Sequence, residues 1–144
     1  MSAILDPFDG WRAVHLHEVA DCSDFADGFA ASGGHINPDG AAHGLLNTDS
    51  RGPKIANLPN VFSQFGHIRA EVYREGVVLD AGGPAPLRGR YVLRDVDGFA
   101  VVFHENEDDH RTQPLGGSGA RIACAAFPQV SKKAPSTTRT NEDV

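Results

Sequence analysis

The segment from Ala20 to Leu58 limits the possible folds of this chain more than any other feature. Its content of Gly, Asp, Asn and Pro excludes a regular helix or strand over a length much greater than that of most loops. A loop of this length is either functional or disordered, and the histidines within it favour a functional loop. The whole chain has 16 Gly and 9 Pro, a composition that favours many turns and short strands over long helices.

Four of the seven histidines fall between His15 and His43. His15 and His17 are separated by one residue, so on a strand both rings project from one face and can bind the same ion. His35 and His43 follow a Gly-Gly pair in the sequence GGHINPDGAAHG, which indicates an ordered irregular loop. An H-x-H pair alone is a weak signal, because two surface histidines at this spacing often arise by chance. The combined pattern is much stronger and predicts a metal site.

Short runs of apolar residues predict a set of strands. The expected strands are Trp11–Glu18, Ile68–Tyr73, Val77–Asp80, Tyr91–Leu93, Phe99–His104 and Ala120–Phe127. The second and third of these are expected to form a hairpin, and Ala81–Arg88 a turn-rich connector. If the odd-numbered residues of Phe99–His104 face the core, the even-numbered residues, His104 among them, face outward. A second irregular loop, dense in charge, is expected over Glu105–Gly119.

Length and charge also bound the function. The chain of 144 residues fits one domain, expected over residues 1–127, whereas residues 128–144 have no apolar periodicity and are expected to form a disordered tail. The formal net charge of -6 argues against nucleic acid or an anionic membrane as a partner. No apolar run is long enough to span a bilayer. The N-terminal sequence MSAILDPFDGW lacks the features of a secretory signal, so a cytosolic protein is expected unless the true start lies upstream.

The two cysteines, Cys22 and Cys124, lie far apart in the sequence, which excludes a compact C-x-x-C metal or redox motif. Composition leaves two interpretations open. The residues are either two separate buried thiols or one long-range disulfide, and a disulfide would imply an oxidising compartment.

Five motifs occur in the order VHLHE, GGHINP, HGLLN, VVFHENEDDH and GGSGARIAC. Together they resemble the copper-zinc superoxide dismutase family in its bacterial form, from Trp11 to Cys124. The resemblance is specific, because five separated motifs agree in order and in approximate spacing. It implies an all-β fold, a Greek-key β-barrel of sandwich type with two long functional loops.

The resemblance implies an enzyme that oxidises one superoxide ion to oxygen and reduces the next to hydrogen peroxide. It implies a set of four copper ligands, namely His15, His17, His35 and His104, and four imidazoles suit Cu(II). Arg121 resembles the arginine that guides anions in this family, and its positive charge would hold superoxide beside the metal. The expected catalytic site therefore consists of the four histidines and one guanidinium.

The resemblance also implies roles for residues around the copper ligands. Cys22 and Cys124 fall at the positions of the family's intramolecular disulfide. Asp108 resembles the aspartate that links a copper histidine to a zinc histidine, and the alternative is a solvated acid in an acidic loop. Two further histidines have no counterpart among the family's ligands and are expected at the surface: His67 and His110.

The zinc site departs from the family pattern. His35 and His43 match two zinc ligands, but Lys54 stands in the place of the third histidine and Asn57 in the place of the aspartate. A structural zinc ion needs four N, S or carboxylate ligands, and a neighbouring ammonium repels it. Weak or no zinc binding is therefore expected, with His43 stabilising its loop through hydrogen bonds instead.

A second departure lies at the N-terminus, where only 14 residues precede His15. Family members have roughly two more strands there, and a barrel without them exposes its core and strand edges. Three explanations compete: a misplaced start codon, a partner that supplies the strands, or a decayed gene. The first is favoured because it also explains the absent signal sequence. The resemblance implies a periplasmic or secreted protein in its complete form, and it allows a homodimer.

Two functional hypotheses follow. The first is a copper-dependent superoxide dismutase, supported by the four copper histidines and Arg121. The second is a non-catalytic copper-binding or structural module of the same fold, supported by Lys54, Asn57 and the short N-terminus. An unrelated β-sandwich with scattered histidines is the least favoured interpretation.

Overall fold

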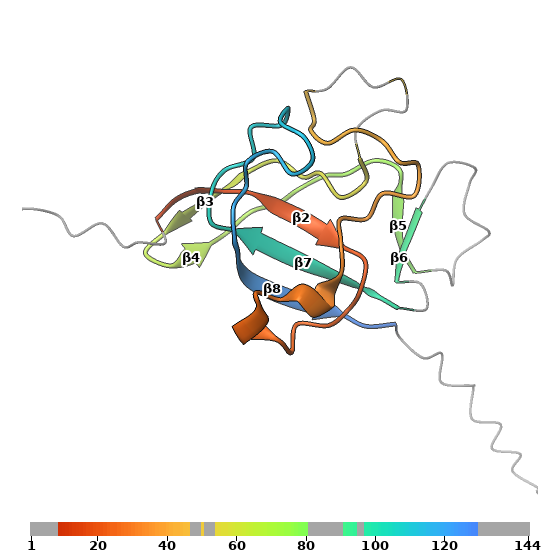
Figure 1. Cartoon of the computed structure of the whole chain (residues 1–144), viewed down its shortest axis with the longest axis horizontal. Helices are drawn as coiled ribbons and strands as arrows, with labels where there is room; N and C mark the ends of the chain where they lie inside the picture. The colour runs from red at the N-terminus through yellow and green to blue at the C-terminus, as the bar shows by residue number, and fades with distance from the viewer. Residues whose placement is uncertain (1–8, 47–49, 51–53, 81–90, 95–96, 130–144) are drawn as a thin grey trace, which may run out of the picture.

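Figure 1 shows the computed structural model, which describes residues 9–46, 50, 54–80, 91–94 and 97–129. Within these residues the regular structure consists of strands and two single-turn 3-10 helices, so the all-β prediction is confirmed. The elements are β1 (Gly10–Arg12), β2 (Val14–His17), η1 (Phe25–Asp27), η2 (Ala30–Ser32), β3 (Val61–Gln64), β4 (His67–Ile68), β5 (Val77–Asp80), β6 (Tyr91–Arg94), β7 (Phe99–His104) and β8 (Arg121–Phe127). None of the described helical turns is long and apolar enough to cross a membrane.

The strands form two antiparallel sheets and one parallel pair. One sheet has the order β1-β3-β4, the other has the order β2-β7-β8, and β5 pairs with β6 in parallel. Residues 10–12 and 14–17 thus belong to different sheets, because the chain changes sheet at Ala13. The single strand expected over Trp11–Glu18 is therefore two strands. Between the two sheets lies the hydrophobic core, which takes side chains from β2, β3, β6 and β7.

The strand β2 is buried along its whole length. Its register with β7 places His15 opposite Val102 and His17 opposite Ala100, so these four side chains share one face. Leu16 lies on the opposite face and belongs to the hydrophobic core. A strand with one apolar face and one histidine face can be buried on both only if something covers the histidines.

The long loop after β2 provides that cover. The Leu16 amide donates to the Ala56 carbonyl at 3.1 Å, and the Ile36 amide donates to the Leu16 carbonyl at 3.0 Å. On the histidine face of the sheet, Ala100 and Val102 have exposed fractions of 0%. The expectation that the even-numbered residues of β7 face outward is therefore wrong, although the odd-numbered residues do pack on the core. The expectation that Ala20–Leu58 forms an ordered irregular loop is confirmed where the structure describes it, apart from the turns η1 and η2.

The predicted hairpin over residues 68–80 is wrong. Of the expected strand Ile68–Tyr73, only Ile68 lies in a strand, as part of His67–Ile68. This strand pairs with Val61–Gln64, which the sequence did not predict as a strand. The strand Val77–Asp80 is confirmed, but its partner is Tyr91–Arg94 in a parallel arrangement. The expected connector over Ala81–Arg88 and most of the expected tail, residues 130–144, lie outside the described residues.

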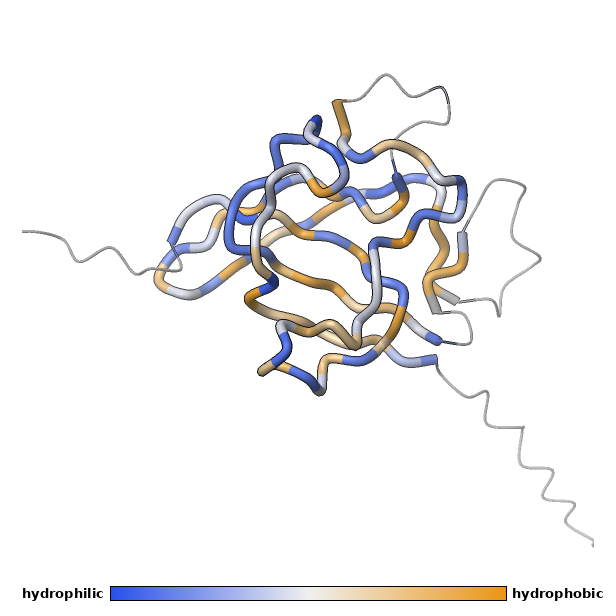
Figure 2. Tube along the Cα trace, in the orientation of Figure 1, coloured by the Kyte–Doolittle hydropathy of each residue, from blue (hydrophilic) through white to orange (hydrophobic). Residues whose placement is uncertain are grey.

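An open apolar cavity of about 410 Å³ lies between the two antiparallel sheets, and its lining residues come from β1, β3, β4, β7 and β8. Among the described residues β8 pairs with β7 on one edge only. Large apolar side chains are exposed on the outer part of the β1-β3-β4 sheet, including Trp11 at 54% and Phe65 at 73%. Figure 2 shows the contrast between the apolar central strands and the mostly hydrophilic loop that follows β7.

Candidate metal centre

Four histidines from separate parts of the chain meet beside β2. His15 and His17 project from β2, and His35 reaches them because its backbone forms an isolated antiparallel bridge with His17. His104 stands at the end of β7, where a register shift follows Phe103 and its amide donates to the Ala13 carbonyl at 2.9 Å. The local chain path therefore brings residues separated by up to 89 positions to one place.

The rings of these histidines are in mutual contact range. The centroid of the His15 ring lies 4.2 Å from that of His35 and 4.8 Å from that of His104, and His17 lies 4.9 Å from His35. One ligand nitrogen from each of His15, His35 and His104 lies within 4.8 Å of the others. The His17 ring is further out on one side, at 5.9 Å from the His104 ring. Such a cluster can share one metal ion.

The hydrogen bonds decide which nitrogen of each ring faces the centre. His15 Nε2 donates to Asp108 Oδ2 at 2.7 Å, His17 Nδ1 to the Gly33 carbonyl at 2.9 Å, and His104 Nδ1 to the Gly119 carbonyl at 3.3 Å. The opposite nitrogen of each ring is then unprotonated and carries a lone pair. These atoms, His15 Nδ1, His17 Nε2 and His104 Nε2, are buried and have no hydrogen-bond partner among the described residues. A buried polar atom without a partner is costly, and a bound metal ion would satisfy it.

Burial keeps these rings neutral. The pKa of His17 is lowered to about 3 and that of His104 to about 4, chiefly by desolvation, with smaller contributions from Arg121 and the neighbouring histidines. The pKa values of His15 and His35 are also lowered, again chiefly by burial. Neutral imidazole is the form that binds metals, so the protein holds these side chains in a state ready for coordination. The donor set fits copper, because imidazole nitrogen suits Cu(II).

Asp108 connects this cluster to His43. Its Oδ2 accepts from His15 Nε2 at 2.7 Å and from His43 Nε2 at 2.8 Å. Burial alone raises the pKa of Asp108, but the hydrogen bonds from His15, His43 and the His110 amide more than offset it, so the net pKa is well below the usual range. Of the two interpretations of Asp108, the buried link between two histidines is the one that the structure has.

Gly116 makes this arrangement possible. It has a φ of 66°, and a Cβ at this position would collide with Asp108 Oδ1 and lie 2.6 Å from His43 Nε2. The chain can pass this close to the buried aspartate only without a side chain. Backbone geometry of the loop after β7 is thus fitted to the carboxylate.

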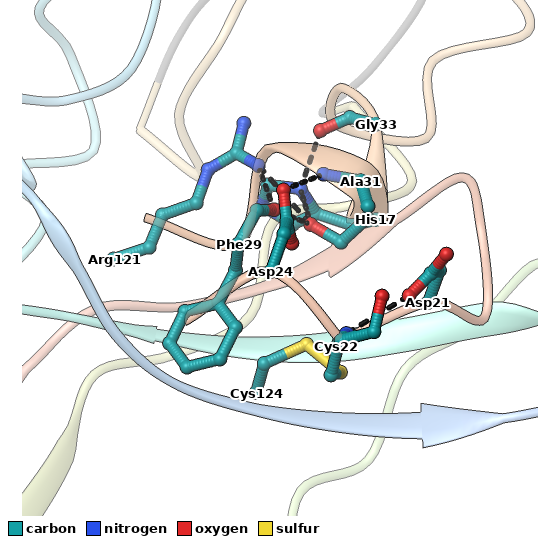
Figure 3. Close-up of a disulfide and its surroundings, with 11 residues drawn as sticks. His17, Asp21, Cys22, Asp24, Phe29, Ala31, Gly33, Arg121 and Cys124 are labelled. Atoms are coloured by element: carbon teal, nitrogen blue, oxygen red, sulfur yellow. Dashed lines mark hydrogen bonds between the residues drawn. A yellow bond between two sulfur atoms is a disulfide. The ribbon is translucent and has the colours of Figure 1, made fainter. Parts of the chain in front are cut away.

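Arg121 is fixed beside His17. Its guanidinium Nη1 donates to the Phe29 carbonyl at 2.7 Å and to Ser32 Oγ at 3.1 Å, and Ser32 Oγ lies 3.3 Å from His17 Nδ1 (Figure 3). The side chain is half-buried, and its charge contributes to the lowered pKa values of His17 and His104. A positive charge is therefore held next to the histidine cluster.

The disulfide between Cys22 and Cys124 joins the start of the long loop to β8. It lies on the same strand as Arg121 and close to the turn that Arg121 contacts, as Figure 3 shows. Of the two interpretations of the cysteines, the long-range disulfide is confirmed. The cross-link ties the loop that carries Phe29 and Ser32 to the strand that carries the guanidinium.

The residues expected at a second, zinc-binding site do not suit a divalent cation. Lys54 is 8% exposed and places a positive charge near Asp108, His15 and His35. A positive charge this close to the site repels a divalent cation. Asn57 supplies only a neutral amide. The expectation of a degraded zinc site agrees with this geometry.

His43 stabilises its loop through hydrogen bonds, as expected. Its amide donates to Gln113 Oε1 at 2.8 Å, and Gln113 Nε2 donates back to the His43 carbonyl at 2.9 Å. His67 is exposed, which confirms that expectation. His110 differs from it, since its side chain is only 15% exposed and its Nδ1 lies 3.5 Å from Asp108 Oδ2. Its amide donates to Asp108 Oδ1, which draws the residue inward.

Sequence reasoning missed two serines that contact the histidine cluster. Ser32 and Ser118 are both fully buried, and Ser118 Oγ lies 3.4 Å from His104 Nδ1. Each precedes the glycine whose carbonyl accepts from the histidine. The repeated Ser-Gly dipeptide was a signal in the sequence that could have identified them.

Comparisons with known proteins agree with this geometry. Residues 3–127 match the family model described as copper/zinc superoxide dismutase. The chain is 43% identical over 120 residues to a Cu-Zn superoxide dismutase of Caulobacter vibrioides, covering 82% of this chain and 64% of that protein. It is 35% identical over 116 residues to superoxide dismutase 2 of Aquifex aeolicus, covering 80% of this chain and 62% of that protein. The chain thus spans slightly less than two thirds of the length of these relatives.

The fold is similar to solved structures as well. A mutant of an SOD-like protein from Bacillus subtilis superposes with a TM-score of 0.68 at 31% identity, covering 85% of this chain and 74% of that chain. The sandwich-type Greek-key fold implied by the motifs is therefore the fold of this chain.

Proposed function

Because the chain belongs to the copper/zinc superoxide dismutase family, we propose that it is a copper-dependent superoxide dismutase. The reaction converts two superoxide ions and two protons into one molecule of oxygen and one of hydrogen peroxide. The observation that carries the proposal is the group of ligand nitrogens of His15, His35 and His104, which lie within 4.8 Å of one another. The ring of His17 and the fixed guanidinium of Arg121 lie beside this group.

Copper would be held by four imidazoles, those of His15, His17, His35 and His104. When bound, copper supplies the one-electron oxidation and the one-electron reduction that the reaction needs. The polypeptide fixes the tautomer of three of these rings through Asp108, Gly33 and Gly119, so their lone pairs are aimed before the ion arrives.

Arg121 would bind the substrate. Its hydrogen bonds to Phe29 and Ser32 use one nitrogen, Nη1, and hold the planar guanidinium at a fixed place beside His17. A guanidinium is positively charged at all relevant pH values and attracts a small anion. This local charge matters because the whole chain has a net charge of -6, which by itself repels superoxide.

We extend the proposal to location and assembly. A disulfide with a sequence separation of 102 residues persists in an oxidising compartment, which supports a periplasmic or extracellular protein. An association of two copies would cover exposed apolar side chains such as Trp11 and Phe62, which are 54% and 49% exposed. Sedimentation of the purified protein at several concentrations tests the second point.

The main experiment loads the protein with copper alone and measures both its EPR spectrum and its rate of superoxide consumption. The expected spectrum shows Cu(II) hyperfine coupling to nitrogen ligands. His104→Ala is expected to change the spectrum and abolish activity, because it removes one ligand. Arg121→Ala is expected to keep the spectrum and to lower the rate by about 10-fold or more, because it removes the substrate's counter-charge.

Matched controls are available on the sheet away from the site. His67→Ala and Arg69→Ala remove an exposed histidine and an exposed arginine, and both are expected to behave like the wild type. A copper spectrum without any turnover in the wild-type protein would contradict the enzyme and support a non-catalytic copper-binding module. Loss of activity in the control variants would contradict the assignment of His104 and Arg121.

A further inference from the structure

Lys54 is a buried cation that is anchored at both ends of the residue. Its Nζ donates to the Pro114 carbonyl at 3.4 Å, and its own carbonyl accepts from Arg74 Nη2 at 3.1 Å. The side chain is only 8% exposed. The ammonium group therefore has a defined place beside the loop that follows β7.

The charge of Lys54 acts on Asp108, which links His15 to His43, and on two of the clustered histidines. Burial lowers the pKa of Lys54, and the carboxylate of Asp108 opposes this shift by favouring the charged ammonium. The charge of Lys54 in turn lowers the pKa values of His15 and His35. Asp108 in turn accepts hydrogen bonds from His15 and His43. A positive charge thus already lies near the carboxylate, where the family pattern would have a second metal ion.

The missing negative charge of the Asn57 side chain gives a second indication. The side chain has an exposed fraction of 0%, and neither its Oδ1 nor its Nδ2 has a hydrogen-bond partner among the described residues. The residue lies beside the cluster, since its backbone forms an isolated bridge with His15. A neutral amide in this place gives a divalent ion no compensating negative charge, whereas it tolerates a neighbouring ammonium.

We propose that the ammonium of Lys54 takes the place of the zinc ion, so that each copy of the chain holds one metal ion and supplies the second positive charge from its own polypeptide. The part of the proposal that concerns copper rests on the function proposed above. The part that concerns zinc does not, because it depends only on Lys54, Asn57 and the groups around them.

Hydrogen bonds within the polypeptide perform the structural task of a second metal. Asn60 Nδ2 donates to the Asp108 carbonyl and the Asp108 amide donates to Asn60 Oδ1, both at 2.8 Å. Gln113 is joined to His43 by a similar reciprocal pair. With the contact from Lys54 to Pro114, these bonds connect the two long loops directly. The loops therefore need no zinc ion to hold them together.

The first test measures metal content after copper loading, addition of excess zinc and gel filtration. Wild type is expected to retain one copper and no zinc, and Asn57→Asp alone is expected to behave likewise because Lys54 remains. The double variant Lys54→His/Asn57→Asp is expected to retain one copper and one zinc, and Co(II) in place of zinc is expected to give an intense visible spectrum typical of tetrahedral coordination.

Retention of one zinc ion by the wild type, or by Asn57→Asp as tightly as by the double variant, would overturn the proposal. Failure of every variant to retain copper would refute the proposed copper site instead. In that case the difference in zinc uptake between the wild type and the double variant still decides the role of Lys54.

The second test measures the reduction potential of the bound copper, a quantity that loss of packing alone would not shift in a fixed direction. Lys54→Met is expected to lower the potential, because removal of a nearby positive charge favours the more positive oxidised ion. Lys54→Arg is expected to retain most of the wild-type value, since it keeps the charge. Arg69→Met, which removes an exposed charge, serves as the control. Equal potentials in folded Lys54→Met and Arg69→Met would overturn the proposal.

Discussion

His17 and His104 are held in the same way, although they come from different strands. Nδ1 of each ring donates to the carbonyl of a glycine, at 2.9 Å and 3.3 Å respectively, and the hydroxyl of the preceding serine lies 3.3 Å and 3.4 Å from the same nitrogen. The two glycines, Gly33 and Gly119, have φ values of 77° and 74°, which L-residues with a side chain rarely adopt. Two separate loops thus use the same Ser-Gly arrangement to orient a histidine ring.

Replacement of Gly119 tests this arrangement. Gly119→Ala is expected to destabilise the protein by about 2–4 kcal/mol and to weaken copper binding, because φ is positive and the new Cβ would lie 2.6 Å from Asn106 Nδ2. Urea unfolding and competition with a copper chelator measure the two effects. Gly117→Ala is the control, since φ is 68° but nothing lies within 4 Å of its Cβ. It is expected to cost only about 1–2 kcal/mol and to leave copper affinity unchanged.

Loss of the charge on Asp108 is expected to weaken copper binding. Asp108→Asn replaces the carboxylate, whose Oδ2 accepts from both His15 and His43, with a neutral amide. The His15 ring is then no longer held in one tautomer. A drop in copper affinity of about 10–100-fold is expected, measured by chelator competition. Asp109→Asn changes an exposed neighbour that only bonds Arg111 and Thr112, and is expected to have no effect on affinity. Equal affinities for the two variants would contradict the role of Asp108.

Removal of the disulfide is expected to reduce stability strongly. In the chain-entropy model, a cross-link that closes a loop of about 100 residues contributes about 4.7 kcal/mol, and the separation here is 102 residues. The double variant Cys22→Ser/Cys124→Ser should therefore unfold at a much lower urea concentration. The fraction of activity that this variant loses is also expected to exceed the fraction of bound copper that it loses. The reason is that the contact of Arg121 with Phe29 depends on the tethered loop. An unchanged unfolding midpoint would contradict this account.

The copper-free protein is expected to lose stability as the pH falls below about 6.5. In the unfolded chain each histidine takes up a proton near this pH, whereas burial lowers the pKa of His17 to about 3 and that of His104 to about 4 in the folded protein. The unfolded state therefore binds more protons over this range, and each of the two residues costs up to about 1.4 kcal/mol per pH unit. Urea unfolding at pH 7 and pH 5 measures the change, and a higher midpoint at pH 5 would contradict it.

Many residues of the candidate site could be predicted because they occur in short sequence motifs. His15 and His17 are recognisable from their spacing on a strand, and Cys22 and Cys124 from their place in the family pattern. Ser32 was missed because the Ser-Gly dipeptide, although it recurs at Ser118, does not by itself show which histidine the serine lies beside. The inward position of His110 depends on a single backbone bond to Asp108, which no sequence pattern indicates.

The fold could be predicted less completely, for physical reasons. Val61–Gln64 is a strand because it pairs with both β1 and β4, a non-local contact that four residues cannot signal by themselves. Ile68–Tyr73 has a strand-like composition but finds a partner for only one of its residues, Ile68. The even-numbered residues of β7 are apolar or metal-directed, and only the folded long loop shows that their face is covered. Tertiary pairing thus overrides local propensity at each of these places.

The contact from Lys54 to Pro114 has a consequence for how the protein matures. The positive charge of a lysine is present in every copy of the chain once it is synthesised, whereas a zinc ion must be bound afterwards. On the proposal made above for Lys54, the chain would need one metal element to mature instead of two.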